Sequence, residues 1–519
     1  MIGQALDHLV GWFNPAAAAR RVNARNVYGQ LVKRGYDAAK LDRSTSAWST
    51  SNSSPDLELS LAASTIRARA RDLVRNNAYA RGILRARVRN VVGCGIKPQS
   101  RIVDASQEPV ERLNEQIEEL FGRWCKMADA TGRLTFYEVQ RLAYQEVDEA
   151  GECLIHFTTL AEDRSRPVSL ALELIDADRL ADDYMGPRIR PGENEIRRGV
   201  EVDPLGRPVA YWIYPNHPSD VTGAYAMPVR MPANEFIHLY RSERIGQTRG
   251  VSLFAPVVTW LKHLGYYVEN ELQASAVASC FTAVVKTLGG GSDGALLATS
   301  DTDTSDTDGN RFEYLQPGMV ARLMPGEEIE TVNPGRPNAS ADAWINLILR
   351  SIAVGAGLSY ERLARDYTQT NYSSARASDL EDRKEFRADQ DWLVSHLCEP
   401  VWQRFIEAAV LEGKLPITSE QLIEDYSGWT RHTWQTPGWE WVDPVKEAQA
   451  SGLALQSNLT TLSDELGSRG RDLHDTLRQL AREKALKQEL GLSATEKADT
   501  NEEMESDGEE SETSAATAE

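Results

Sequence analysis

The stretch TQTNYSSARASDLEDRKEF, residues 368–386, separates two apolar helical patterns and changes character along its length. Its first seven residues are polar and uncharged, and a dense run of mixed charges follows. Serine is favoured at helix N-caps, and Ser378 with Glu381 has the spacing of a capping box. The stretch therefore predicts a flexible polar loop that leads into a charged helix, with Ser373, Ser374 and Ser378 at the helix entry.

The neighbouring segments predict long helices. Apolar side chains at helical spacing favour one helix over residues 340–354 and another that runs roughly 35–40 residues beyond the loop, to Gly413. Pro400 is expected to kink the second helix, because proline removes a backbone donor and crowds the preceding turn. Upstream, residues 254–286 predict a further long helix, ended by the glycines at 289–291.

The middle of the chain predicts strands as well as helices. Residues 168–180, 197–215 and 235–244 are rich in β-branched and aromatic side chains, and DPLG at 203–206 has the chemistry of a hairpin turn. Residues 1–64 contain an alanine run and a serine-rich piece, and predict a poorly ordered arm with short helices. The fold class expected from these patterns is α+β.

Charge is unevenly distributed along this acidic chain of net charge −20. Residues 1–101 carry 17 Lys/Arg against 6 Asp/Glu, whereas residues 496–519 carry 1 Lys against 10 acids. A protein that grips nucleic acid along its length usually has a basic surplus. The composition therefore favours loose contact with DNA at chosen positions, and no segment is long and apolar enough to predict a membrane partner.

The basic segment 65–101 has two interpretations. It holds ten basic residues and one acid, which suits either a DNA-contacting helix or an interface helix whose arginine stems cover apolar surface. The second interpretation is favoured, because no aromatic residues alternate with the arginines as a single-strand binder would require.

Catalytic and metal-binding signatures are not evident in the sequence. There is no P-loop, no nucleophile elbow surrounds Ser373 and Ser374, and the five scattered cysteines argue against a zinc site. Asp176 and Asp178 would share one face of a strand, but no third ligand lies nearby in the sequence. No catalytic residue, metal ligand or cofactor is therefore expected; a metal-dependent nuclease built on these two acids is the enzymatic alternative.

Seven motifs, taken in order, resemble the lambda-type portal family of tailed bacteriophages, and together they span about residues 60–490. They are RNNAYARGILRARVRNVVGCGIKPQ (75–99), LELIDADRL (172–180), RRGVEVDPLGRPVAYWIY (197–214), GQTRGVS (246–252), NPGRPNASADAW (333–344), NYSSARASDLEDR (371–383) and WVDPVKEAQA (441–450).

The resemblance implies a portal fold, with a mixed α/β wing, a long α-helical stem, a small β-containing clip and a helical crown, that assembles into a ring. The implied division is a flexible arm (1–59), wing (60–250 and, with the long kinked helix, 373–440), stem helices (251–287 and 338–357), clip (288–337), tunnel loop (358–372), crown (441–490) and disordered acidic tail (491–519).

The resemblance also implies a function and partners. Portal rings, typically of twelve subunits, form a channel at one capsid vertex of the virion through which double-stranded DNA is packaged and later ejected. The implied partners are the terminase large subunit, the major capsid and scaffolding proteins, and head–tail connector proteins, with assembly in the host cytoplasm. The portal interpretation predicts a non-enzymatic protein without cofactors.

Candidate site residues follow from these implied parts. In the tunnel loop, Thr368, Gln369, Thr370 and Asn371 are expected to face DNA, which slides more easily past an acidic body with few phosphate-binding cations. Lys262 and Lys286, on the first stem helix, are candidate basic rings of the channel. The clip residues expected to face the terminase or connector are Asp301, Asp303, Asp306 and Asp308.

Overall fold

The computed structural model describes residues 12, 43, 52–104, 106, 108–161, 163, 165–187, 190, 192–220, 226–279, 283–287, 327–331, 340–439, 444–471 and 473–490. The chain divides into two units, Met1–Ser54 and Pro55–Glu519, and all the elements below belong to the second. Among the helices in these ranges, none combines the length and apolar character of a membrane-spanning segment.

The basic segment forms two consecutive helices, α3 (Pro55–Asn76) and α4 (Ala78–Val91). The first was expected near residue 65 but begins at Pro55, so residues 55–59, assigned to a flexible arm, are helical. Proline in the first turn followed by two acids is a favourable helix start, and Leu59 is buried. Asn77 caps the second helix by accepting hydrogen bonds from two backbone amides.

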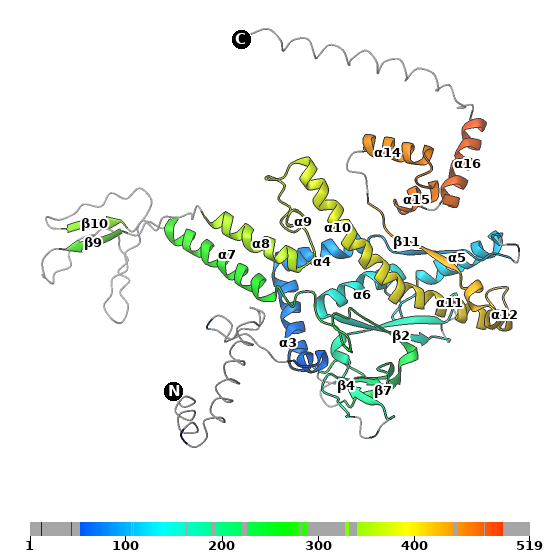
Figure 1. The fold of residues 1–519 in the computed structure, drawn as a ribbon, viewed down its shortest axis with the longest axis horizontal. Helices are drawn as coiled ribbons and strands as arrows, with labels where there is room; N and C mark the ends of the chain where they lie inside the picture. Colours follow the sequence, from blue (N-terminus) through cyan, green and yellow to red (C-terminus); the bar gives the residue numbers. More distant parts are fainter. Residues whose placement is uncertain are drawn as a thin grey trace, which may run out of the picture. The chain divides into compact units, whose positions relative to one another are not determined.

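Two helices and two antiparallel sheets form the mixed body, as the sequence predicted (Figure 1). The helices are α5 (Glu111–Cys125) and α6 (Phe136–Ala150). One sheet has the order β3-β2-β8, from β2 (Glu152–Thr159), β3 (Leu170–Ile175) and β8 (Phe236–Tyr240); the other has the order β4-β5-β6-β7, from β4 (Glu195–Arg197), β5 (Val200–Val202), β6 (Pro208–Ile213) and β7 (Val229–Pro232).

The predicted DPLG hairpin joins β5 to β6. The amide of Gly206 donates to the carbonyl of Asp203 at 2.9 Å, and Gly206 has a φ of 86°, which glycine adopts without strain. Two 3₁₀ turns, Ala177–Arg179 (η2) and Ala233–Glu235 (η3), complete this region.

A buried aromatic cluster ties the C-terminal part of the chain to α5. Phe121 and Trp124 of α5 lie against Phe405, with ring centroids 5.0 and 5.4 Å away. Strand β1 (Lys97–Ser100) pairs with β11 (His432–Gln435), so residues more than 330 positions apart share a two-stranded sheet.

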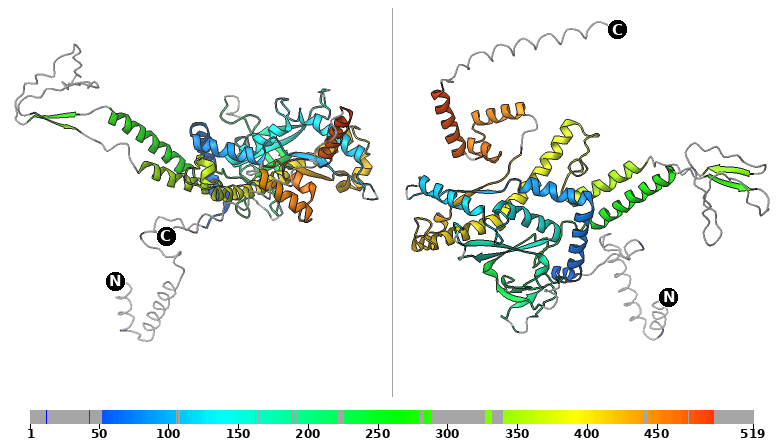
Figure 2. Two further views of the ribbon diagram at one scale, coloured as in Figure 1. Left: turned by 90° about the horizontal axis from the view of Figure 1, so that it is seen from above. Right: turned by 180° about the vertical axis from the view of Figure 1, so that it is seen from behind.

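Helices α7 (Val258–Ser279) and α8 (Ala341–Gly355) pack side by side, as both views show (Figures 1 and 2). The second matches its predicted range. The first ends earlier than predicted, and β9 (Ala283–Thr287) follows it and pairs with β10 (Glu327–Thr331). The sequence AVVKT of β9 contains β-branched residues, which favour a strand over the helical continuation that was expected.

The predicted long helix after the loop is divided by one π-helical turn into two α-helices. It consists of α10 (Tyr372–Leu393), the π-helical turn Val394–Cys398 (η4) and α11 (Glu399–Leu411). The π turn lies directly before Pro400, where the proline ring needs room that a regular α-helical turn lacks. The structure therefore shows a widened turn close to this proline, whereas the expected kink stays a prediction.

Short helices complete the chain after α11. They are α12 (Ser419–Glu424), α13 (Tyr426–Trp429), α14 (Pro444–Gln456), α15 (Leu462–Gly467) and α16 (Leu473–Glu489). Arg478 of α16 forms an ion pair with Glu115 of α5 at 2.6 Å.

Candidate functional site: the loop before α10 and the ion pairs that support it

The segment between α8 and α10 is more ordered than the flexible loop that the sequence predicted. It contains the helix α9 (Tyr360–Ala364), which Ser359 caps by accepting a hydrogen bond from the amide of Arg362 at 3.4 Å. Two stretches of this segment lie outside a helix, residues 356–359 and 365–371, and the candidate DNA-facing residues 368–371 belong to the second.

Local hydrogen bonds shape residues 365–371. The carboxylate of Asp366 accepts from the amide and hydroxyl of Thr368 at 3.0 and 2.7 Å, and these bonds lower the pKa of Asp366. The hydroxyl of Thr370 donates to the carbonyl of Tyr367 at 3.0 Å. Thr368 and Gln369 are exposed, and Thr370 is half-buried.

Asn371, rather than a serine, caps α10: its side chain accepts a hydrogen bond from the amide of Ser374 at 2.8 Å. Ser373 and Ser374 lie in the first turn, so their placement at the helix entry is confirmed while the capping role is not. Ser378 forms no capping box; its hydroxyl donates to Glu361 at 3.1 Å. Asparagine is as good a cap as serine, and it comes first along the chain.

The acids of α10 hold α9 in place. The buried carboxylate of Asp382 accepts from the amide and hydroxyl of Ser359 at 2.8 and 2.7 Å, and from the guanidinium of Arg362 at 2.7 Å. Arg362 also pairs with Asp379 and lies over the ring of Phe386 at 5.1 Å. One face of α10 therefore fixes the start of the candidate loop.

A second group of charges joins α10 to the mixed body. Asp389 accepts from Arg87 of α4 at 2.6 Å and from Tyr144 of α6 at 2.7 Å, and pairs with Arg241 at 3.2 Å. The same two arginines reach the fully buried Asp148, at 2.8 and 2.6 Å. Burial acts to lower the pKa of Arg87, but Asp148 and Asp389 raise it above its usual range.

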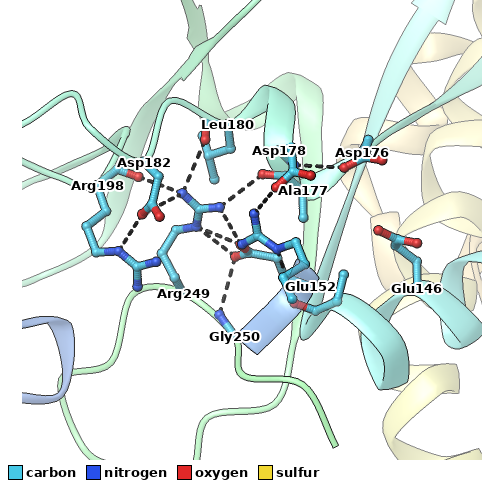
Figure 3. Close-up of polar contacts among 12 residues, drawn as sticks. Glu146, Glu152, Asp176, Ala177, Asp178, Leu180, Asp182, Arg198, Arg249 and Gly250 are labelled. Atoms are coloured by element: carbon cyan, nitrogen blue, oxygen red, sulfur yellow. Dashed lines mark hydrogen bonds and ion pairs between the residues drawn. The ribbon is translucent and has the colours of Figure 1, made fainter. Parts of the chain in front are cut away.

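A third group surrounds Glu152, which has no exposed side-chain surface (Figure 3). Its carboxylate pairs with Arg249, accepts from Arg67 at 3.1 Å and lies 3.0 Å from His238. Arg249 also donates to the carbonyl of Ala177 at 3.1 Å. Burial alone would raise the pKa of Glu152, but Arg249 and the hydrogen bond with His238 hold it well below its usual range.

The two acids of the enzymatic alternative belong to this ion-pair system. His217 supplies the third group that the sequence did not reveal, and ligand atoms of the three residues lie within 4.8 Å of one another. However, Asp178 pairs with both Arg67 and Arg71, and Asp176 pairs with Arg71 at 2.8 Å. Two guanidinium groups already neutralise these carboxylates, so their environment does not favour a metal cation.

The two candidate basic residues lie on different elements. Lys262 is exposed on α7, with its ammonium 4.9 Å from the centroid of the Tyr266 ring. Lys286 lies on β9, opposite Glu328 of β10, and its assignment to the stem helix is wrong because the helix ends before it. The four clip acids at 301, 303, 306 and 308 lie outside the described residues.

Sequence reasoning missed the acidic face of α10, although a signal was present. Asp379, Asp382, Phe386 and Asp389 follow one another at spacings of three and four, which places them on one side of a helix. Acids among the residues of an apolar stripe indicate buried partners, because burying a carboxylate alone is very costly.

Comparisons with known proteins give a consistent result. The family model described as "Phage portal protein, lambda family" matches residues 41–390. The "Probable portal protein" of Halomonas phage phiHAP-1 is 28% identical over 441 residues, covering 82% of this chain and 81% of its own. Portal protein B of Escherichia phage lambda is 24% identical, covering 82% and 84%.

A solved structure shows a weaker likeness. A chain in the neck of a native gene transfer agent particle, computed with C12 symmetry, aligns with a TM-score of 0.40 and 11% identity, covering 76% of this chain and 91% of that one.

Proposed function

Because this chain belongs to the lambda family of phage portal proteins, we propose that it is one subunit of a ring, of twelve copies, through which double-stranded DNA enters and leaves the capsid. The portal role itself follows from the family, and it is structural and not enzymatic. The ring, the DNA path and the partners are the content of the proposal.

The observation that carries the ring is the set of large apolar side chains that α7 and α8 leave exposed. Monomeric soluble proteins rarely expose large apolar patches, and a closed ring buries such faces between neighbouring subunits. The exposed large apolar side chains of the two helices are Trp260, Tyr266 and Leu272 on α7, and Trp344, Leu347 and Val354 on α8.

The composition of the loop supports the proposal that DNA passes through the ring without being bound tightly. Residues 368–371 are polar and uncharged, so they can touch a duplex without the counterion release that makes cationic contacts bind tightly. The ion pair of Asp382 with Arg362 holds α9, which precedes this loop, against α10, and this would keep the position of the loop constant while DNA moves.

The remaining assignments are proposed on the family resemblance. The wing would meet the major capsid and scaffolding proteins, and the clip at 288–337 would meet the terminase large subunit and the connector proteins. The protein would assemble in the host cytoplasm and remain at the portal vertex of the virion.

The loop assignment is tested by replacing Thr368 and Gln369 with alanine in the phage. Packaged DNA per particle is expected to fall several-fold while purified rings keep the parental appearance by electron microscopy. The matched control is Glu381→Ala with Lys384→Ala, which removes an exposed pair on α10 and leaves the net charge unchanged. Loss of rings in the loop variant would place the loop in a subunit interface and contradict the assignment.

A further inference from the structure

Helix α4 carries four arginines and no acid. Arg87 is buried and binds Asp148 and Asp389, whereas Arg81, Arg85 and Arg89 are exposed. These three are spaced four residues apart, so they share one face of the helix and cover about 12 Å along its axis.

The three exposed arginines make no ion pair within the part of the chain that the structure describes. Some other exposed arginines do pair, such as Arg207 with Asp203 at 2.7 Å and Arg230 with Glu201 at 2.7 Å. Like charges four residues apart destabilise a helix by a few tenths of a kcal/mol per pair. In a chain of net charge −20, an unpaired cationic face is therefore not explained by the stability of the subunit.

The face belongs to the helix that supports the candidate DNA-facing segment. Arg87, on the opposite side of α4 from the three exposed arginines, donates to the carbonyl of Ala356, just after α8, at 3.4 Å, and to Asp389 of α10 at 2.6 Å. Helix α4 packs against both α9 and α10, and Figure 1 shows it beside them.

We propose that Arg81, Arg85 and Arg89 form a contact surface for the phosphate backbone of duplex DNA. Guanidinium groups bind phosphate oxygens with charge-assisted hydrogen bonds, and a basic stripe along a helix is the electrostatic footprint of a nucleic-acid contact. The other exposed residues on this face include Ala78 and Gly82, which offer no aromatic ring for stacking bases. The surface therefore suits a duplex rather than a single strand.

This inference rests on the proposed portal function but names a contact that the loop does not supply. Three cations per subunit would add a salt-dependent contribution to DNA binding, since each phosphate contact adds about 0.9 to the magnitude of the slope of log affinity against log salt concentration.

The test uses the full-length protein in its assembled form and a blunt-ended duplex, with binding measured over a range of KCl concentrations. In the variant Arg81→Gln/Arg85→Gln/Arg89→Gln, the magnitude of the salt slope is expected to fall by roughly one to three. The control Arg190→Gln/Arg207→Gln/Lys384→Gln removes the same charge from sites exposed by 81, 74 and 71%, each beside a local carboxylate. The control is expected to keep the parental slope.

Three results would overturn the inference. An unchanged slope in the α4 variant, or an equal fall in the control, would show that the surface is not a specific phosphate contact. Loss of rings in the α4 variant alone would show that the arginines face an acidic surface of a neighbouring copy. If the α4 variant forms intact rings and packages DNA normally with an unchanged slope, the α4 contact is rejected and the portal function is unaffected. If the parental protein itself forms no rings, the result counts against the portal function.

Discussion

Glu152 shows, at the scale of the residue, how this acidic protein uses its basic segment. Its carboxylate has no contact with solvent and is surrounded by Arg249, Arg67 and His238. Arg67 fits neither interpretation of the basic segment, the DNA contact or the arginine stem on an apolar interface, because its guanidinium is buried and neutralises acids of the same chain. Arg71 and Arg87 also pair with acids of the same chain.

The substitution Glu152→Gln is expected to lower the free energy of unfolding by about 3–5 kcal/mol, because it leaves buried guanidinium groups uncompensated. Urea unfolding of the purified protein measures this. The control Glu381→Gln changes a carboxylate that is 72% exposed and is expected to have little measurable effect. Equal effects of the two substitutions would refute the buried role of Glu152.

The same residue predicts a dependence on pH. The folded-state pKa of Glu152 lies well below the ordinary value of 4.5. Its stabilisation is therefore fully present above about pH 4.5 and is lost as the pH falls from there towards the folded pKa. The difference in unfolding free energy between the parent and Glu152→Gln should narrow between pH 6 and pH 3. A difference that stays constant over this range would be incompatible with an ionised Glu152.

The sequence could not supply these pairings. Asp176 and Asp178 suggested a metal site because their two carboxylates would share one face of a strand, whereas the arginines that neutralise them lie 105 to 111 positions away. A single sequence shows the charge of each side chain, but it does not show which distant residue neutralises that charge.

At the scale of the element, α10 connects the candidate loop to the mixed body. Its acids contact α9 through Asp382 and contact α4 and α6 through Asp389. These contacts come from one face of α10. A displacement of α10 and the loop before it would therefore be opposed by ion pairs at two positions, Asp382 and Asp389.

The substitution Asp382→Ala is expected to speed amide hydrogen exchange in residues 359–366 by roughly tenfold or more, because leaving buried donors unpaired costs about 1–3 kcal/mol. Ring assembly should persist. Exchange measured by mass spectrometry tests this, with Asp391→Ala on the exposed side of α10 as the control. Unchanged exchange in residues 359–366 would mean that Asp382 does not hold α9.

Elements with strong local signals were predictable. Residues 340–354 matched α8 closely, because apolar spacing and terminal glycines agree there. The predicted end of α7 was wrong, since the apolar pattern was extended into AVVKT, whose β-branched residues favour a strand and which pairs antiparallel with β10. The start of α3 was missed because the serine-rich piece before Pro55 obscured its favourable first turn.

At the scale of the whole molecule, the family and its portal role were recoverable from the order of the motifs, whereas the partners and the residues facing DNA remain predictions. The acidic charge and the exposed apolar side chains of α7 and α8 are the two global features that a portal ring would use.

The substitutions Leu272→Glu and Leu347→Glu place charges on side chains that are 67% and 52% exposed in the subunit. They are expected to prevent ring formation while circular dichroism stays parental, because a carboxylate would be buried without a partner only in the assembly. Leu205→Glu, at an 80% exposed position in the DPLG turn, is the control and should leave rings intact. Rings in the double variant would exclude these faces from the interface.

Native mass spectrometry of the purified full-length protein, at micromolar concentration and over a range of salt, tests the central claim most directly. The portal account predicts one closed species of twelve copies of the 57.7 kDa chain. Stable monomers under every salt condition, with no higher assembly, would contradict it.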